Sequence, residues 1–216
     1  MNNKEKYIEY RLLNKNNMIK GLPKLIIHIS GASGSGKTTL GNKLKNNLGN
    51  KIVVKDIDNL REEYYRNKEV DIIDKNAYQK FIDDYIYKIN KPLIFVGLNN
   101  YPWLHKDIYY NMYSNHNFYI DLDNKIIIKQ KCIDYLKNEN LKNKIEINDM
   151  IHNKKFIMNI LEDIKKEYYG FDIIEINNKW KEDYKYQGYR IISREEIYDI
   201  VSKILNNNLY DGQLWL

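Results

Sequence analysis

The 216-residue chain has few of the residues on which secreted and membrane proteins depend. Its single cysteine, Cys132, excludes an internal disulfide and a zinc site made of cysteines, and it indicates a reducing compartment. No apolar run approaches the roughly 20 residues that a membrane-spanning helix needs. The N-terminal stretch MNNKEKYIEYRLLNK is too polar for a secretory signal. We therefore expect a cytoplasmic protein with no membrane partner.

Arginine is scarce, although the chain is basic. The net charge is +6, carried mostly by lysine, and no arginine lies between Arg66 and Arg190. Abundant Asn, Lys, Ile and Tyr are typical of a protein encoded in AT-rich DNA, so the charge alone is a weak sign of nucleic-acid binding. A nucleic acid is thus a possible partner but not an expected one. The hydrophobic fraction of 43% is enough for a folded core, and the length suits one domain.

Apolar runs alternate with segments of helical spacing, which is the pattern of an α/β protein. We expect a single domain, 1–216, in three layers: a mainly parallel five-stranded sheet with helices on both faces. Strands are predicted at 24–30, 51–58, 93–97, 117–123 and 188–193, with a weaker candidate, FDIIEI, at 171–176. Helices are predicted at 37–48, 60–66, 74–90, 124–139, 147–169 and 194–207. Residues 1–20 are expected to form a short helix and a linker, 98–116 a loop, and 208–216 a tail.

The first predicted strand is followed by the stretch GASGSGKTT, residues 31–39. It matches the pattern G-x-x-x-x-G-K-[ST] between a strand and a helix, which is the context that this motif requires. Backbone N–H groups can wrap a phosphate chain only where few side chains stand in the way, which explains the crowding of glycine. The expected nucleotide-binding residues are Gly31, Ala32, Ser33, Gly34, Ser35, Gly36, Lys37, Thr38 and Thr39.

The end of this loop predicts a bound nucleoside triphosphate, ATP in the simplest case, together with Mg²⁺. Lys37 would reach the β- and γ-phosphates, and the Thr38 hydroxyl would be a ligand of Mg²⁺. Thr39 would contact the α-phosphate. The helix that begins after the loop would add the positive end of its dipole.

The loop, on a single domain of this length, resembles that of the small P-loop kinases, which include the shikimate, gluconate and adenylylsulfate kinases and the nucleoside and nucleotide kinases. The resemblance is specific over residues 24–60 and only architectural over 60–207. It implies a P-loop NTPase fold with a helical lid. It also implies transfer of the γ-phosphate of ATP to a hydroxyl or phosphate of a small molecule, such as a nucleoside, a nucleotide or a sugar-like acceptor.

Asp56-Ile57-Asp58 ends the second predicted strand, where strand alternation would put both carboxylates on one face. It resembles the D-x-D of shikimate kinase-like enzymes. The resemblance implies that Asp56 binds Mg²⁺, through water, and that Asp58 binds or deprotonates the accepting hydroxyl. In the alternative interpretation, Asp58 or Asn59 caps a helix that begins near Leu60.

The third predicted strand ends in FVGLNN and lacks the aspartate with which many P-loop proteins bind magnesium. Its absence argues against motor-type ATPases and switch GTPases. Shikimate kinase-like proteins have a glycine at this edge that lets the backbone approach the acceptor, which implies the same use of Gly97. Asn99 or Asn100 could then donate to a substrate oxygen. A plain turn is the alternative, since Gly and Asn are common in turns.

Residues 124–169 occupy the place of the lid in the small kinases, where cations stabilise the transferring phosphoryl group. These cations are usually arginines, and this chain has none there. Lysines would have to serve, with Lys129 and Lys131 as the expected catalytic pair. Alternatively, these lysines belong to a solvated helix face.

Three arginines complete the predicted site. Arg61 and Arg66 follow the D-x-D and could hold an anionic or polyhydroxyl acceptor, or could pair with neighbouring glutamates on the surface. Arg194 stands at the end of the last predicted strand, where the related kinases line the adenine. Ser193-Arg194 is equally typical of a capped helix start.

Two other classes of function stay open. The missing aspartate and the arginine-free lid are compatible with a non-catalytic or regulatory NTP-binding protein. The basic charge permits a kinase of nucleic-acid ends, whose affinity for oligonucleotides would fall with rising salt concentration.

Overall fold

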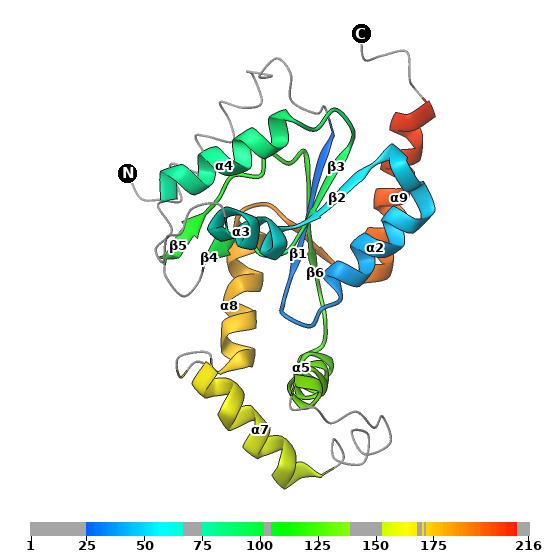
Figure 1. The fold of residues 1–216 in the computed structure, drawn as a ribbon. Helices are drawn as coiled ribbons and strands as arrows, with labels where there is room; N and C mark the ends of the chain where they lie inside the picture. The colour runs from blue at the N-terminus through cyan, green and yellow to red at the C-terminus, as the bar shows by residue number, and fades with distance from the viewer. Residues whose placement is uncertain are drawn as a thin grey trace.

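A computed structural model describes residues 25–66, 75–101, 105–138, 153–167, 170 and 172–210. Within this part the chain is an α/β protein built on a five-stranded sheet whose strands are all parallel (Figure 1). The strands lie in the order β2-β3-β1-β6-β7. Their bounds are β1 Ile26–Gly31, β2 Val53–Asp56, β3 Leu93–Val96, β6 His116–Ile120 and β7 Arg190–Ile192. They correspond to the five strands predicted from the sequence, so the expected parallel α/β sheet is confirmed.

The central strand is β1, and every one of its residues is buried. It pairs with β3 on one side and with β6 on the other, which explains its continuous apolar sequence. After β1 the chain builds the β2–β3 side of the sheet and then crosses to β6 and β7. In such sheets ligands bind outside the carboxyl ends of the strands where the winding reverses, which here is the end of β1.

One face of the sheet is covered by α2 (Lys37–Leu48) and α9 (Arg194–Tyr210), which lie against each other (Figure 1). A short 3₁₀ turn, η1 (Gly49–Lys51), connects α2 to β2. Alternate β1 side chains point to this face and form a core with aliphatic residues of both helices: Ile27, Ile29, Leu40, Leu44, Ile197, Val201 and Leu205. This core fixes α2, and with it the end of the loop, against the sheet.

The opposite face is covered by α3 (Ile57–Arg66), α4 (Lys75–Tyr87) and α8 (Ile173–Tyr186). Ile26 and His28 point this way, because successive strand side chains alternate between faces. The core under α3 and α4 combines aliphatic and aromatic residues: Ile57, Leu60, Tyr64, Tyr78, Ile82, Leu93 and Phe95. Under α8 the core contains Tyr119, Ile176, Trp180, Tyr184 and Tyr189.

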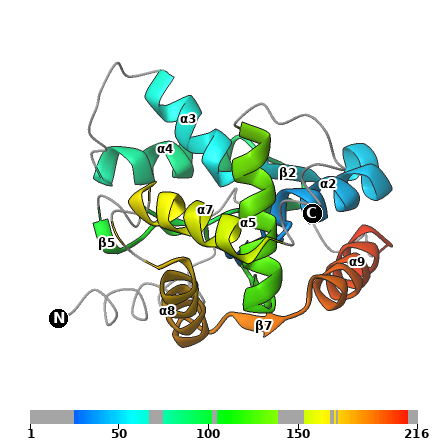
Figure 2. The same ribbon diagram turned by 90° about the horizontal axis from the view of Figure 1, so that it is seen from below.

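Two helices, α5 (Asn124–Asn138) and α7 (Lys154–Glu167), project beyond the carboxyl edge of the sheet (Figures 1 and 2). They share a small core of their own with the start of α8, made of Cys132, Leu136, Ile160, Ile164 and Ile173. They correspond to the two helices expected within 124–169. The part of that segment at 139–152 lies outside the described residues.

The segment FDIIEI was considered as a weak strand, but its residues 173–176 begin helix α8 instead, and Phe171 lies outside the described residues. Asp172 caps this helix, and its side chain accepts hydrogen bonds from the backbone N–H groups of residues 174 and 175 at 2.7 and 3.3 Å. From this start Ile173 and Ile176 lie on one buried helical face with residues further along α8. The short apolar run was a misleading signal, because buried helix starts and buried strands look alike over six residues.

Residues 98–116, expected to be a loop, contain a small antiparallel pair, β4 (Asn100–Tyr101) and β5 (His105–Tyr109). The predictions for residues 1–20 and for the end of the tail, 211–216, lie outside the described residues. The beginning of the expected tail continues α9. None of the described helices is long and apolar enough to cross a membrane.

A buried histidine, His28 of β1, connects the residue after β3 to the residue before β7 by hydrogen bonds. His28 Nε2 lies 2.9 Å from the carbonyl oxygen of Gly97, which can only accept, so Nε2 carries the proton. Nδ1 therefore accepts from the hydroxyl of Tyr189 at 2.6 Å. Burial lowers the pKa of His28 to about 4, against the hydrogen bond to Gly97, and nearby Lys37 adds to the lowering.

We expect the protein to lose stability as pH falls from 6.5 towards 4. In this range the unfolded chain binds a proton at His28 and the folded protein does not, which favours unfolding by up to about 3 kcal/mol. His116, whose pKa is also lowered by burial, contributes in the same direction. Urea unfolding at neutral and acidic pH measures this loss. His28→Gln, which cannot titrate, is expected to be less stable at neutral pH but to lose less on acidification; an equal loss would contradict the assignment.

Candidate functional site

The loop between β1 and α2 has the backbone geometry of an anion-binding turn. Gly36 is the N-cap of α2 and has a φ of 83°, in the left-handed region that favours glycine. Because this cap has no side chain, nothing in it competes for the first N–H groups of α2, which point out of the helix end. The helix end and its dipole therefore favour a negatively charged group at this position.

The side chain of Lys37 folds back over the loop. Its Nζ donates to the carbonyl oxygens of Gly31 at 2.9 Å and Ala32 at 2.7 Å. Burial lowers the pKa of Lys37 to about 8; the carboxylates of Asp58 and Asp56 oppose this, and Lys131 adds to it. The ammonium is thus held by neutral carbonyl groups, with no carboxylate in direct contact among the described residues. A negatively charged ligand would stabilise its charged form.

Asp56, at the end of β2, connects the loop after β1 to a strand that is two positions away in the sheet. The Thr38 hydroxyl donates to Asp56 Oδ2 at 2.8 Å, and the backbone N–H of Asp58 donates to Asp56 Oδ1 at 2.9 Å. The second bond is an N-cap of α3, which begins at Ile57. The cap is therefore Asp56, not Asp58 or Asn59. The expectation that both carboxylates leave one face of a strand is wrong, because the strand ends at Asp56 and Asp58 lies in the first helical turn.

Asp58 is oriented by a largely buried arginine, Arg61. Arg61 Nη1 donates to Asp58 Oδ1 at 2.8 Å, while its Nη2 donates to the carbonyl oxygens of Leu98 at 3.1 Å and Asn100 at 3.3 Å. The side chain of Arg61 is 15% exposed and that of Asp58 is 68% exposed. Arg61 thus connects the segment after β3 to α3 and leaves the carboxylate of Asp58 open to solvent.

Arg66 lies apart from this arrangement. It is 78% exposed and pairs with Glu62 one turn earlier on α3, with 3.3 Å between Nη2 and Oε2. The alternative of a surface pairing, considered from the sequence, therefore describes Arg66, and the prediction that it holds an acceptor receives no support from its position. Surface pairs of this kind contribute less than about 1 kcal/mol to stability.

Gly97 and Asn99, both predicted to contact the acceptor, have structural roles here. Gly97 has a φ of 132°, and a Cβ on it would lie 3.0 Å from the Cβ of Ile57. The side chain of Asn99 donates to the carbonyl oxygen of Tyr110 at 2.8 Å and accepts from the Tyr184 hydroxyl at 2.7 Å. Asn99 is only 1% exposed, so it ties α8 to the segment after β3 rather than facing a ligand.

Two side chains flank the loop, Gln130 of α5 and Arg194 at the start of α9, and only Arg194 was predicted from the sequence. A Cβ on Gly34 would lie 3.0 Å from Cγ of Gln130, so α5 passes directly over the loop. A Cβ on Gly36 would lie 2.9 Å from Nη1 of Arg194, which places this arginine at the loop from the α9 side. Gln130 carries no motif, and only the path of α5 brings it to the loop. Spacing along the predicted helix could have identified its face but not its partner.

The two predicted lid lysines differ in position. Lys131 is half-buried and close enough to Lys37 to lower its pKa, whereas Lys129 is exposed. Their neighbour Gln130 donates to Asp134 at 3.0 Å along the same helix. Lys131 is therefore the lysine of α5 whose charge acts on the loop.

The Thr38–Asp56 pair offers the ligands that magnesium prefers. A hydroxyl and a carboxylate are hard oxygen donors, and Mg²⁺ in proteins is typically held by one or two such groups together with phosphate and water. Among the described residues no three His, Cys, Asp or Glu side chains form a metal site. The residues present therefore fit a magnesium ion that arrives with a phosphate ligand, and they do not form a protein-only metal centre.

Comparison with known proteins gives little further information. No family model matches the chain, and no curated protein matches it. Among solved structures, the replication initiator DnaA bound to AMPPCP and single-stranded DNA is similar over 81% of this chain and 64% of that chain. The TM-score is 0.28 and the sequence identity 19%, and this chain spans less than two thirds of that structure. A likeness this weak does not bear on the function of this chain.

We expect Lys37→Ala to weaken the binding of Mg·AMPPCP by more than about tenfold. Because the pKa of Lys37 is about 8 without ligand, the affinity of the wild type should also fall as pH rises through that value. Calorimetric titration over this pH range measures both effects. Lys45→Ala, on the exposed face of α2, is the matched control and should bind like wild type. Wild-type affinity in Lys37→Ala would refute a phosphate-binding loop.

Gly97→Ala is expected to destabilise the protein by more than about 1 kcal/mol. The added methyl group meets Ile57, the residue between Asp56 and Asp58, so Mg·AMPPCP binding should weaken as well. Urea unfolding and the same titration measure the two effects. Gly49→Ala is the control, because Gly49 also has positive φ, 56°, but has no atom within 4 Å of the Cβ position. Equal effects of both substitutions would mean that contact with Ile57 is unimportant.

Proposed function

We propose that this protein is an ATP-dependent phosphotransferase that moves the γ-phosphate of Mg·ATP to a hydroxyl or phosphate group of a small molecule. One arrangement carries the proposal: Asp56 accepts from Thr38 of the loop at 2.8 Å and from the backbone of Asp58 at 2.9 Å, and Asp58 is held by Arg61 at 2.8 Å. A phosphate-binding loop, a carboxylate suited to magnesium and a second, exposed carboxylate are thereby coupled.

The loop would bind the triphosphate. Backbone N–H groups of the loop and of the first turn of α2 would donate to phosphate oxygens, and Lys37 would exchange its bonds to Gly31 and Ala32 for bonds to phosphate. Thr38 and Asp56 would hold Mg²⁺, which when bound neutralises charge on the phosphates. Arg194 would border the nucleotide from the α9 side, next to Gly36.

The acceptor would react beside Asp58. Its hydroxyl oxygen attacks the γ-phosphorus, the bond from that phosphorus to the β–γ bridging oxygen breaks, and ADP leaves with the electron pair. The hydroxyl proton passes to the carboxylate of Asp58 and from there to water. The exposure of Asp58, 68%, supports access by a substrate, and Arg61 would keep the carboxylate in one orientation.

Helices α5 and α7 would act as the lid. Such a cover excludes water, which would otherwise accept the phosphoryl group in place of the substrate. The contact of Gln130 with Gly34 and the effect of Lys131 on Lys37 support this role for the segment 124–169. Of the two predicted lysines, Lys131 has the position for a phosphate contact, and Lys129 would have to turn inward on closure.

A non-catalytic NTP-binding protein is the second candidate. One observation favours it: the chain has no arginine between Arg66 and Arg190 and no acidic residue at the end of β3. Lysine supplies charge without the two-pronged hydrogen bonding of arginine. Such a protein would bind Mg·ATP at the same loop but would not form ADP faster with any acceptor.

Asp58→Asn separates these two candidates. In a phosphotransferase it should lower kcat by about a hundredfold or more, because the carboxylate accepts the proton only in the transition state. The affinity for Mg·AMPPCP should stay within about twofold, since Asp58 is not a ligand of the nucleotide. ADP formation with a panel of acceptors, oligonucleotides included, is the measurement. Glu62→Gln, on the exposed side of α3, is the control.

Acceptor-stimulated ADP formation that is equal in Asp58→Asn and wild type would remove Asp58 from the mechanism. No stimulation by any acceptor, with intact Mg·AMPPCP binding, would favour the non-catalytic protein. Stimulation by oligonucleotides alone, decreasing with salt, would identify a kinase of nucleic-acid ends.

A further inference from the structure

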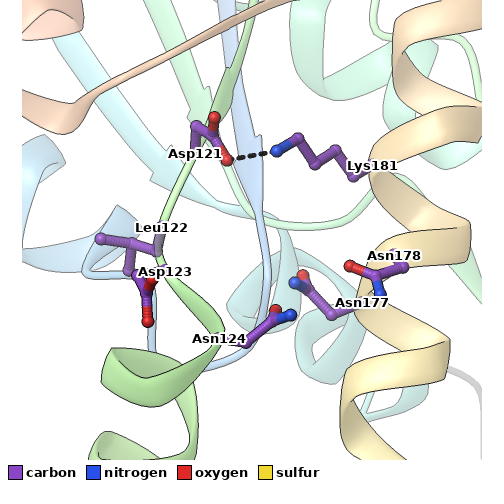
Figure 3. Close-up of a pocket in the computed structure, with 7 residues that line it drawn as sticks. All are labelled: Asp121, Leu122, Asp123, Asn124, Asn177, Asn178 and Lys181. Carbon is purple, nitrogen blue, oxygen red and sulfur yellow. Dashed lines mark hydrogen bonds and ion pairs between the residues drawn. The ribbon is translucent and has the colours of Figure 1, made fainter.

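An open pocket of about 420 Å³ lies where β6 passes into α5 (Figure 3). One wall is the stretch from Asp121 to Asn124, and the other is α8, with Asn177, Asn178 and Lys181. None of the seven lining residues has been assigned a role above, and none was predicted as a site residue from the sequence. The volume is within the range of small-molecule sites.

This pocket borders the phosphate-binding loop. Ile120, the last residue of β6, pairs with Gly31, the first residue of the loop, and Asp121 follows directly. Helix α5 starts at Asn124 in the pocket wall and reaches the loop at Gln130. A ligand in the pocket would therefore lie one strand away from the loop, on the face of the sheet covered by α3, α4 and α8.

One wall residue, Asn177, directs a hydrogen-bond donor into the pocket. Asn177 is only 4% exposed, and its Oδ1 accepts from the Tyr119 hydroxyl at 3.0 Å. Within the described residues the only hydrogen bond of its side chain is this one through Oδ1, and the amide nitrogen points across the pocket towards Asn124 (Figure 3). The nitrogen is not among the buried polar atoms that lack a partner, so it is open to the pocket and can donate to water or to a ligand.

The wall of the pocket is fixed before any ligand arrives. Besides the bond from Tyr119 to Asn177, α8 is held by Tyr109, whose hydroxyl donates to Asp183 at 3.1 Å, and by the bond between Tyr184 and Asn99. Lys181 is held by Asp121 at 2.6 Å. A preformed polar wall lowers the entropy cost of binding a ligand.

The lining excludes several kinds of ligand. It contains no arginine, so it lacks the bidentate hydrogen-bond donor that is common in phosphate sites. It also contains no aromatic side chain on which a nucleobase could stack. Its two carboxylates, Asp121 and Asp123, outnumber its one ammonium group, that of Lys181, and disfavour an anion. Carboxylates, amides and an ammonium together offer alternating acceptors and donors, which match a run of neighbouring hydroxyl groups.

We propose that this pocket binds the acceptor, and that the acceptor is an uncharged, polyhydroxylated molecule such as a sugar, a polyol or the sugar of a nucleoside. This proposal rests on the proposed phosphotransferase function and narrows its substrate class. Asn177 donates to a substrate hydroxyl, and Asp121 and Lys181 bind neighbouring hydroxyl groups. Asp58 lies on the other side of the loop and does not contact the hydroxyl groups that the pocket binds.

Ligand-observed NMR in the presence of Mg·AMPPCP tests binding without requiring turnover. The uncharged probes are D-ribose, D-glucose, myo-inositol and adenosine, and the anionic probes are AMP and gluconate. We expect at least one uncharged probe to bind, and Lys181→Met to weaken it by about tenfold or more. Lys179→Met, on the exposed side of the same helix, should leave binding unchanged. Asn177→Asp, which keeps the oxygen that accepts from Tyr119 and removes the donor, should weaken binding too. Thermal unfolding checks that each variant is folded.

The proposal is overturned if no uncharged probe binds, if Lys181→Met and Lys179→Met behave alike, or if an anionic probe binds more tightly and depends on Lys181. The two proposals fail separately. Binding of a polyol that depends on Lys181, without any phosphorylated product, would sustain the pocket and refute the phosphotransferase. ADP formation with an acceptor whose KM is unchanged in Lys181→Met would support the phosphotransferase and refute the pocket as the acceptor site. Asp58→Asn should lower kcat without changing the affinity for the polyol.

Discussion

The carboxylate of Asp56 is the point on which the candidate site depends, because each of its oxygens serves a different part of the fold. Oδ1 caps α3 and so determines where the strand stops and the helix begins. Oδ2 accepts from Thr38 and so ties the end of β2 to the start of α2. Between β2 and β1 runs β3, which is followed by Gly97, a residue without a side chain. One residue thus sets the position of Asp58 and of the proposed magnesium ligands together.

Beneath this edge, a set of buried polar groups lies within a core of aliphatic and aromatic side chains. His28 connects the carbonyl group of Gly97 to the hydroxyl of Tyr189, and Tyr184, which packs edge-on against Tyr189 at 4.7 Å, binds Asn99. Buried polar groups that are all hydrogen-bonded fix one arrangement, since a shifted one would leave donors or acceptors without partners. These groups therefore hold α8 and the segment after β3 in register with the loop.

Because arginine is scarce, few guanidinium groups are available to the phosphate-binding loop. Arg61 is engaged with two backbone carbonyl groups and Asp58, Arg66 is on the surface, and Arg194 lies at Gly36. The positive charge near the loop therefore comes from Lys37, with Lys131 close to it, and from Arg194, which forms an ion pair with Glu195. The repulsion between the two lysines and the burial of Lys37 disfavour the free ammonium, and both effects would be relieved by a bound polyphosphate. The unliganded site is thus electrostatically prepared for an anion.

The sequence by itself determined the features that local rules control. Continuous apolar runs placed the five parallel strands, glycine crowding and the Lys-Thr ending placed the loop, and Ser193 capped α9 as its spacing to Glu196 suggests. Tertiary structure decided what depends on contacts between distant segments. Residues 173–176 are helical because Ile173 packs with α5 and α7 and Ile176 packs with Tyr119 of β6, and the carboxylate of Asp56 meets the hydroxyl of Thr38 from another segment. Gln130 reached Gly34, and Asn177 came to face Asn124, only through the paths of α5 and α8. No local pattern encodes these pairings, since each joins residues that are brought together by the packing of whole helices against the sheet.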